Sequence, residues 1–214
     1  MSETASLLLV MLLLQAGPAP GPGSNPSSVI QAVEQKYAGL KSLSASFSQS
    51  YQNAEQRLEE SGTLVLKKPG RMYWEYHKPT TKHFLVDGKK SIFYVPEDKQ
   101  AIVSEIDLDD ASVPLLLLFG RTGIEQNFQV SWETEEAPRS AENALVRLTP
   151  REPQGEFTHV LLEVTPSALV HRLTVFDPIG SRNDYVFSDI RENANVPDRS
   201  FNLKLPKDVE LIKE

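Results

Sequence analysis

The sequence predicts a mainly β protein in which about ten or eleven antiparallel strands form one sheet that curls toward a barrel. Apolar and polar residues alternate over most of the chain from Ser44 to Ile190. Turn residues interrupt this alternation about every 10 to 12 residues, as in an antiparallel meander. Helical periodicity is confined to one N-terminal segment and one insertion in the middle of the chain.

One amphipathic helix precedes the strands. Its apolar residues recur at intervals of three and four, as expected of a helix with one buried face; they are Val29, Val33, Tyr37, Leu40 and Leu43. Ser28 followed by Gln31 predicts a capping box at the helix start. Gly39 predicts that the last turn is weak.

Two groups of strands flank the insertion. The first group is predicted within residues 44–49, 64–66, 72–76, 84–86, 92–95 and 102–106. Asp87-Gly88 predicts a hairpin turn within this group. The second group is predicted at residues 129–132, 144–149, 158–165, 169–176 and 185–190. Alternation returns in the tail at Phe201, Leu203 and Leu205.

The insertion, residues 111–120, predicts a short helix that starts at Pro114 and ends at Gly120, followed by another short helix at 121–128. Residues 115–119 are apolar on every side of the first helix, so that helix should be buried all round. Two interpretations remain open. The segment is either a plug of the core or a lid, with one face closing a cavity that holds an apolar ligand.

The N-terminus predicts export. The apolar run Leu7–Leu14 is too short to span a membrane and precedes a zone of small residues, as in a secretory signal peptide. Glu3 and the lack of a basic residue before the run disagree with this interpretation. A buried N-terminal helix is the alternative, but the Gly/Pro-rich stretch after it would detach it from a core. We expect residues 1–23 to be a signal peptide and residues 24–214 to form a single domain.

Composition excludes several classes of function. The net charge of −7 disfavours binding to nucleic acid. The absence of cysteine excludes disulfides, thiolate metal sites, cysteine nucleophiles and lipid attachment to cysteine. The four histidines are scattered, and no nucleophile elbow or phosphate-binding loop is present. We therefore expect no catalytic residues, no metal and no cofactor, although carboxylates brought together by folding stay an alternative.

Several segments together resemble the periplasmic outer-membrane lipoprotein carriers (LolA-like proteins). The most specific is KPGRMYWEY at residues 68–76. The other segments are residues 44–49, 62–64, 87–89, 94–96, 114–117 and 201–206. The resemblance runs from about Val29 to Ile212. It implies an unclosed antiparallel β-barrel of about 11 strands with an N-terminal helix and a short helical lid over a hydrophobic cavity.

The resemblance also implies the residues of a site. Apolar side chains of the strands and the lid would bind acyl chains: Leu64, Leu66, Met72, Trp74, Tyr76, Phe84, Phe93, Leu115, Leu116, Leu117 and Leu118. Strand parity independently places Leu64 and Leu66 on one face, with Lys68 at the end of the row. In relatives a basic residue at the position of Lys68 latches the lid. Many of them have arginine there, and lysine lacks its planar fork of donors.

The implied function is that of a periplasmic, monomeric carrier and not an enzyme. It would take the acyl chains of lipoproteins from an inner-membrane ATP-driven exporter and deliver them to an outer-membrane receptor. Rival interpretations are that receptor itself, a stress sensor, a lipid hydrolase, and a carrier of another lipid such as a glycolipid. The missing cysteine disfavours the lipid-anchored receptor, and the chain length disfavours the two-domain sensor. The carrier of another lipid is the strongest alternative.

Overall fold

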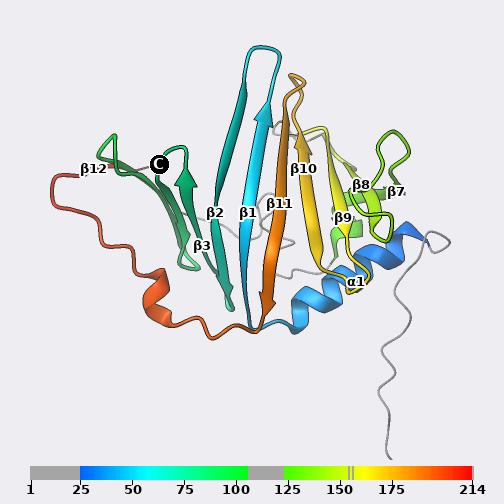
Figure 1. The fold of residues 1–214 in the computed structure, drawn as a ribbon, viewed down its shortest axis with the longest axis horizontal. Coiled ribbons are helices and arrows are strands. Elements are labelled where there is room, and N and C mark those ends of the chain that lie inside the picture. The colour runs from blue at the N-terminus through cyan, green and yellow to red at the C-terminus, as the bar shows by residue number, and fades with distance from the viewer. Residues whose placement is uncertain (1–24, 106–122, 154, 156, 214) are drawn as a thin grey trace, which may run out of the picture.

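The computed structural model describes residues 25–105, 123–153, 155 and 157–213 (Figure 1). The described residues form one sheet of 12 strands in the order β12-β6-β5-β4-β3-β2-β1-β11-β10-β9-β8-β7. The strands are β1 (Ser42–Gln52), β2 (Arg57–Lys67), β3 (Arg71–Lys78), β4 (Lys82–Val86), β5 (Lys90–Val95), β6 (Gln100–Glu105), β7 (Phe128–Trp132), β8 (Ala144–Pro150), β9 (His159–Val164), β10 (Val170–Phe176), β11 (Arg182–Glu192) and β12 (Glu210–Lys213).

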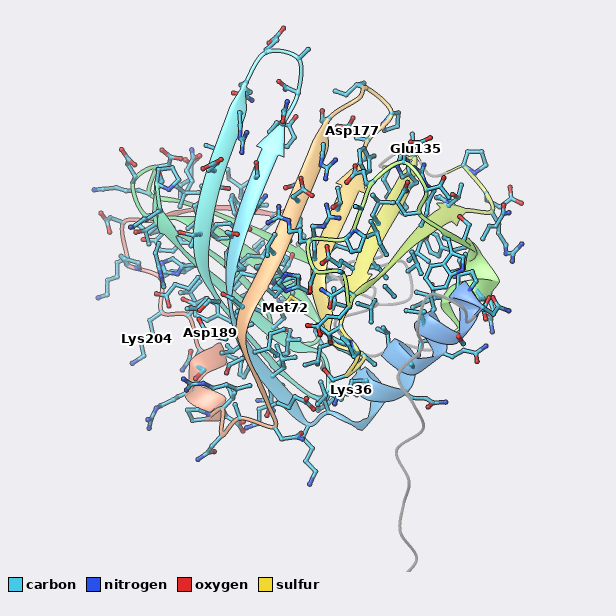
Figure 2. The ribbon with its side chains drawn as sticks, turned by 45° about the vertical axis from the view of Figure 1, so that its right-hand side comes forward. Lys36, Met72, Glu135, Asp177, Asp189 and Lys204 are labelled. Carbon is cyan, nitrogen blue, oxygen red and sulfur yellow. The ribbon has the colours of Figure 1, made fainter. Side chains whose placement is uncertain are left out.

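The sheet is open. Its two outer strands, β12 and β7, each pair with one neighbour only, so the described strands do not close into a ring. Every pair is antiparallel except β12 with β6, which is parallel. Figures 1 and 2 show the strands following a curved surface. The predicted mainly β, unclosed architecture is confirmed, with 12 described strands where about 11 were expected.

Helix α1 (Pro26–Gly39) covers one face of the sheet near β7 and β8. Its N-cap is Asn25, whose side chain accepts a hydrogen bond of 3.0 Å from the backbone N–H of Ser27. The capping box predicted from Ser28 and Gln31 is therefore wrong. The helix begins three residues earlier because Asn25 caps it and Pro26 fits its first turn, where no N–H is needed.

The end of α1 also differs from the expectation. Leu40 is the C-cap, and Leu43 already belongs to β1. Both side chains are nonetheless buried, because the chain turns directly from the helix into the sheet that the helix covers. Beyond the insertion, the predicted helix at 121–128 corresponds to α3 (Ile124–Asn127).

The face toward α1, here called the inner face, carries the main hydrophobic core. This single cluster joins buried residues of α1, of β1 to β4 and of β7 to β11. Because residues from both halves of the sheet meet in one cluster, the sheet curls around this face. The strand alternation that predicted one apolar face is thus satisfied in β1 to β4 and in β7 to β11.

The opposite, outer face of β2 to β5 is covered by the C-terminal segment. Val196 and Phe201 are buried there against Leu85. The tail does not extend the sheet at residues 201–205, where alternation indicated a strand. A 3-10 helix, η1 (Asp198–Phe201), lies there instead, and the last strand forms only at β12. Phe201 and Leu203 are apolar because their side chains pack on the outer face of the sheet, and not because they belong to a strand.

The predicted signal peptide at residues 1–23 and the predicted lid at residues 111–120 lie outside the described residues. Within the described part of the chain, no helix has the length and apolar character needed to cross a bilayer.

Candidate functional site: the inner face of the sheet

Strand register brings the predicted acyl-binding residues of the strands into two neighbouring rows. One row crosses five strands through the cross-strand pairs Ala45–Leu64, Leu64–Trp74, Trp74–Phe84 and Phe84–Phe93. The next row runs through Leu43, Leu66, Met72 and Val86. Residues that are paired across strands share a face, so these side chains form one continuous apolar surface.

The members of this surface differ in exposure. Leu64, Leu66, Met72 and Trp74 are buried, with Met72 wholly inaccessible to solvent. Tyr76, Phe84 and Phe93 are half-buried. The predicted lid residues Leu115, Leu116, Leu117 and Leu118 lie outside the described residues. The acyl-binding role of all these side chains stays a prediction.

An aromatic cluster occupies the centre of the inner face. The Phe47 ring packs edge-on against Trp74 and Tyr76, with ring centroids 4.8 and 4.9 Å apart. Trp74 also contacts Tyr185 at 5.7 Å and Phe187 at 5.9 Å. Figure 2 shows Met72 deep inside the curled sheet, and the Trp74 indole N–H donates to its sulfur. Large, adaptable and apolar side chains of this kind suit a flexible aliphatic ligand.

Gly62 makes room for the aromatic cluster. A Cβ atom at this position would lie 2.9 Å from Cε1 of Phe47 and 1.9 Å from the carbonyl oxygen of Glu75. The register between β2 and β3 also shifts at this point. Only a residue without a side chain leaves room here for both the Phe47 ring and the backbone of β3, so Gly62 positions the centre of the surface.

Lys68 lies beside the C-terminal end of α1. Its ammonium group donates hydrogen bonds of 2.6 and 2.7 Å to the backbone carbonyls of Tyr37 and Ala38. These carbonyls belong to the last turn of the helix, where a cation is favourable. Burial lowers the pKa of Lys68 below its usual value. The structure thus gives Lys68 a helix-capping contact, and the predicted latch to a lid stays a prediction.

Three members of the aromatic cluster are not among the predicted site residues: Phe47, Tyr185 and Phe187. Phe47 belongs to a predicted alternating strand, and Tyr185 and Phe187 have the same parity in another. Their shared face follows from the pairing of β1 with β11, which sets Phe47 opposite Phe187. The two strands are more than a hundred residues apart, so local alternation indicated each strand but not their contact.

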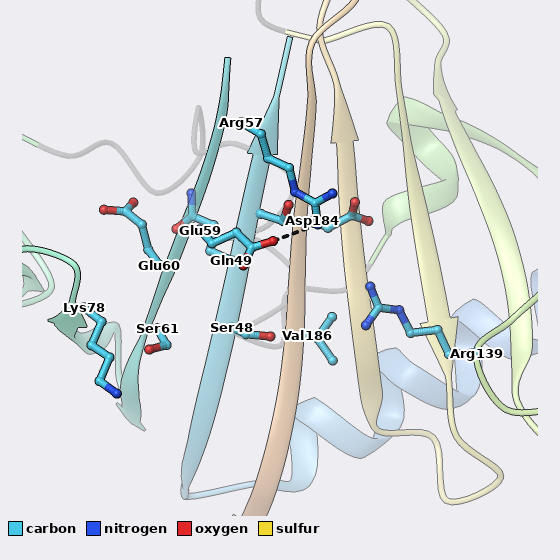
Figure 3. A pocket seen from close by; sticks show the side chains of 11 residues that line it. Ser48, Gln49, Arg57, Glu59, Glu60, Ser61, Lys78, Arg139, Asp184 and Val186 are labelled. Atoms are coloured by element: carbon cyan, nitrogen blue, oxygen red, sulfur yellow. Dashed lines mark ion pairs between the residues drawn. The ribbon is translucent and has the colours of Figure 1, made fainter.

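A second concavity lies on the outer face and is polar (Figure 3). It is a groove of about 460 Å³ across β2, β1 and β11. Its lining includes three serines and three basic residues beside acidic ones: Ser48, Ser50, Ser61, Arg57, Lys78 and Arg139. Hydroxyl and charged groups would leave an acyl chain in a polar environment, so this groove does not suit one. No group of three or more metal-ligating side chains occurs among the described residues.

A curved, unclosed and mainly antiparallel sheet with a continuous aromatic and aliphatic inner face is an architecture that can enclose an apolar ligand. The family described as "Outer membrane lipoprotein carrier protein LolA" matches residues 38–204. The chain belongs to this family.

Individual relatives agree with this assignment. An outer-membrane lipoprotein carrier protein of Chromobacterium violaceum is 28% identical over 186 residues, covering 87% of this chain and 88% of the relative. One from Dechloromonas aromatica is 29% identical over 188 residues, covering 86% and 88%. In fold, the chain resembles an uncharacterized conserved protein of Thermus thermophilus, with a TM-score of 0.58, 12% identity, and coverage of 88% of this chain and 98% of that one.

Proposed function

We propose that this protein is a periplasmic carrier that binds the acyl chains of lipoproteins released from the inner membrane and delivers them to the outer membrane. The observation that carries the proposal is the continuous apolar surface of the inner face, centred on Phe47 and Trp74. Membership of the lipoprotein carrier family and the names of the relatives support it.

The energetics of lipid transfer favour such a surface. Exposing a sixteen-carbon acyl chain to water costs about 0.8 kcal/mol per methylene, on the order of 12 kcal/mol per chain. A lipoprotein leaves a membrane only if an equivalent apolar surface replaces the bilayer. Since the sequence has no nucleotide-binding motif, the energy for release comes from an ATP-driven exporter in the inner membrane.

The proposal includes the remaining partners. The carrier works as a monomer after removal of residues 1–23, performs no chemistry on its cargo, and gives the lipoprotein to an outer-membrane receptor. The helical lid, with Leu115 to Leu118, closes over the acyl chains, and Lys68 holds the lid in its closed position.

Photocrosslinking tests where the acyl chains bind. A photoreactive amino acid at Trp74, or at the half-buried Phe84, is expected to label acyl chains when the carrier is incubated with inner-membrane vesicles that release a lipoprotein. The control position is Thr63, which is exposed on the outer face of β2 beside Leu64. Equal labelling from Thr63 and Trp74 would contradict an inner-face site.

Native mass spectrometry of residues 24–214, purified from a periplasm, identifies the cargo. Triacylated lipoprotein adducts are the expected result. Adducts of a glycolipid or another lipid would keep the apolar site but overturn the proposed cargo. An unliganded mass that persists when lipoprotein is offered would overturn the carrier function itself.

A substitution at Lys68 tests the latch. Lys68→Leu is expected to abolish transfer of cargo to outer-membrane vesicles, whereas Lys68→Arg, which retains the positive charge and the hydrogen-bond donors, should preserve it. Helix content, measured by circular dichroism, reports separately on the contact between Lys68 and α1. Normal transfer by Lys68→Leu would show that the ammonium group only caps the helix.

A further inference from the structure

The inner face changes from apolar to polar along five neighbouring strands. Towards α1 the strands present Leu43, Leu66, Met72 and Val86, and across the middle they present the aromatic cluster. Further from α1 the same strands and β11 present six polar side chains, here called the polar end: Gln49, Glu60, Tyr76, Lys82, Asn183 and Tyr185. Because every strand changes in the same direction, the whole surface is amphipathic along the strand axis.

Hydrogen bonds connect most of the polar end. The Tyr76 hydroxyl donates to the side-chain oxygen of Gln49 at 3.0 Å, and the Gln49 amide donates to that of Asn183 at 3.1 Å. The Asn183 amide donates to the Tyr185 hydroxyl at 3.0 Å. The rings of Tyr76 and Tyr185 belong to the aromatic cluster, so each tyrosine joins the apolar surface to the polar end.

Glu60 and Lys82 form an ion pair next to this chain of hydrogen bonds. The Glu60 side chain is only 7% exposed and that of Lys82 is 23% exposed. The Lys82 ammonium also lies 5.8 Å from the centre of the Tyr76 ring. A buried ion pair stabilises a fold little, because the loss of hydration offsets the attraction between the charges. Its place at the edge of an apolar ligand surface therefore points to a binding role.

The polar end has donors to spare. Gln49 and Asn183 each use one of two amide hydrogens, and Lys82 uses one of three ammonium hydrogens, within the described part of the chain. The Tyr185 hydroxyl accepts a bond, and its own hydrogen has no acceptor among the described residues. Burial, with the Glu60 charge, raises the pKa of Tyr185 to about 12, so this hydroxyl keeps its proton at neutral pH.

We propose that the polar end binds the ester and amide carbonyls where the acyl chains of a lipoprotein join its modified N-terminus. Carbonyl oxygens only accept hydrogen bonds, which matches a surface with unused donors. The ligand is thereby oriented, with its acyl chains extending over the aromatic cluster towards α1 and its protein part leaving past Lys82. This inference rests on the proposed carrier function and adds the residues that bind the polar part of the lipid.

Two photoreactive lipopeptides test the orientation. Both are synthetic peptides with an S-diacylglyceryl cysteine; one carries a diazirine at the end of its acyl chains, and the other carries it on the residue after the cysteine. The acyl probe is expected to label peptides that contain Leu66, Met72 and Val86, and the second probe those that contain Gln49, Lys82 and Asn183. The reverse pattern would overturn the proposed orientation while leaving the carrier function intact. Labelling by neither probe would overturn the carrier function as well.

A pair of matched lipids tests the role of the carbonyls. The dialkyl ether analogue of the lipopeptide has the same chains but lacks the ester carbonyl oxygens. We expect the protein to prefer the ester form by about fivefold in a native mass spectrometry competition, as one or two net hydrogen bonds would give. Equal binding of the two forms would overturn the assignment.

Variants then locate this preference. The double variant Gln49→Leu with Asn183→Leu keeps side chains of similar shape but removes the amide donors. The ratio of ester binding to ether binding should therefore fall towards one. Ser48→Ala is the matched control, because Ser48 is exposed on the outer face of the same strand. Binding of the ether form, which should be the same for all three proteins, confirms that each variant is folded. An unchanged ester preference in the double variant would overturn the role of these amides.

Discussion

At the scale of single residues, the outer face contains a charged pair that is almost completely buried. Glu163 has no solvent exposure, and Arg172 is 4% exposed. The Glu163 carboxylate accepts hydrogen bonds from Arg172 Nε at 3.0 Å, from the backbone N–H of Arg139 at 3.0 Å and from the Asn143 amide at 2.8 Å. Glu163 therefore holds Arg139 and Asn143, which precede β8, against β9. Burial opposes ionisation, but these donors hold the pKa of Glu163 below its usual value.

Substitution of Glu163 by glutamine is expected to cost about 1 to 3 kcal/mol of unfolding free energy. Arg172 would stay buried without its closest carboxylate, and only Glu136 at 3.3 Å and Asp184 at 3.7 Å would still balance its charge. Glu135→Gln is the control. Glu135 pairs with Arg147, but its side chain is 81% exposed, and the expected change is below about 0.5 kcal/mol. Urea unfolding followed by circular dichroism measures both. A loss below about 1 kcal/mol for Glu163→Gln would contradict the importance of the buried pair.

At the scale of single elements, β2 depends on one glycine at its closest approach to β3. Gly62→Ala would place a methyl group against a backbone carbonyl, which cannot move without breaking the sheet. The expected loss is about 1 to 3 kcal/mol. Gly39→Ala, at the end of α1 where nothing lies within 4 Å, should instead stabilise the protein, by about 0.4 to 1 kcal/mol. Thermal unfolding of both variants should therefore shift in opposite directions, and a shift of the same sign would contradict this account.

The C-terminal segment packs on the outer face through two buried side chains, Val196 and the larger Phe201. Phe201 is 7% exposed and packs in the cluster with Leu85, while Asp198 pairs with Lys67 and Arg71 at an exposed position. Phe201→Ala is expected to cost about 3 kcal/mol and to free the segment for proteolysis. Asp198→Asn should change stability by less than about 1 kcal/mol. Equal protease sensitivity of the two variants would contradict the role of the ring, and greater sensitivity of Asp198→Asn would show that charge anchors the segment.

At the scale of the whole molecule, the sequence predicted the pairing of consecutive strands better than the pairing of strands far apart in the chain. The meander from β1 to β6 follows from alternation and turns such as Asp87-Gly88, because each strand pairs with the next. The contact of β1 with β11, which places Phe187 and Tyr185 in the site, is a long-range pairing without a local signal. The short parallel strand β12, which pairs with β6, was not predicted for the same reason. Phe201 wrongly indicated a strand because it is buried by packing on the outer face and not by strand pairing.

The polar end shows the same limit of sequence reasoning. Gln49, Lys82 and Asn183 are ordinary polar residues of predicted strands, loops or strand ends, and alternation cannot tell a polar residue at the edge of a ligand surface from one that faces water. Only the register of β11, β1, β2, β3 and β4 gathers them on one face. The apolar half of the site was predictable because apolar periodicity itself indicates burial.

The stability of the whole molecule should depend on acid pH through a cluster on the outer face. Hydrogen bonds from Arg182 hold the pKa of Glu136 below its usual value of 4.5. Burial opposes the ionisation of Asp184, but Arg182 binds it at 2.6 Å and holds its pKa below the usual 3.8. At a pH between the lowered and the usual pKa values of these carboxyls, the unfolded chain therefore binds more protons than the folded protein. These groups therefore add stability that is complete above about pH 5 and is lost as the pH falls through their lowered values.

Arg182→Gln is the substitution that tests this linkage, because Arg182 is the closer of the two arginines that pair with both Glu136 and Asp184, the other being Arg172. We expect the variant to be less stable than the natural protein by about 2 kcal/mol near pH 7. The difference should narrow below pH 4.5, the usual value for Glu136, because protonated carboxyls gain nothing from Arg182. Urea unfolding at a series of pH values from about 7 to 3 measures this difference in unfolding free energy.

Arg57→Gln is the control, since Arg57 pairs with Glu59 where both side chains are more than 60% exposed. The dependence of its stability on pH should match that of the natural protein. A constant difference between Arg182→Gln and the natural protein at every pH would show that the guanidinium stabilises the sheet by packing on Phe176, whose ring centre lies 5.3 Å away, rather than through the two carboxylates.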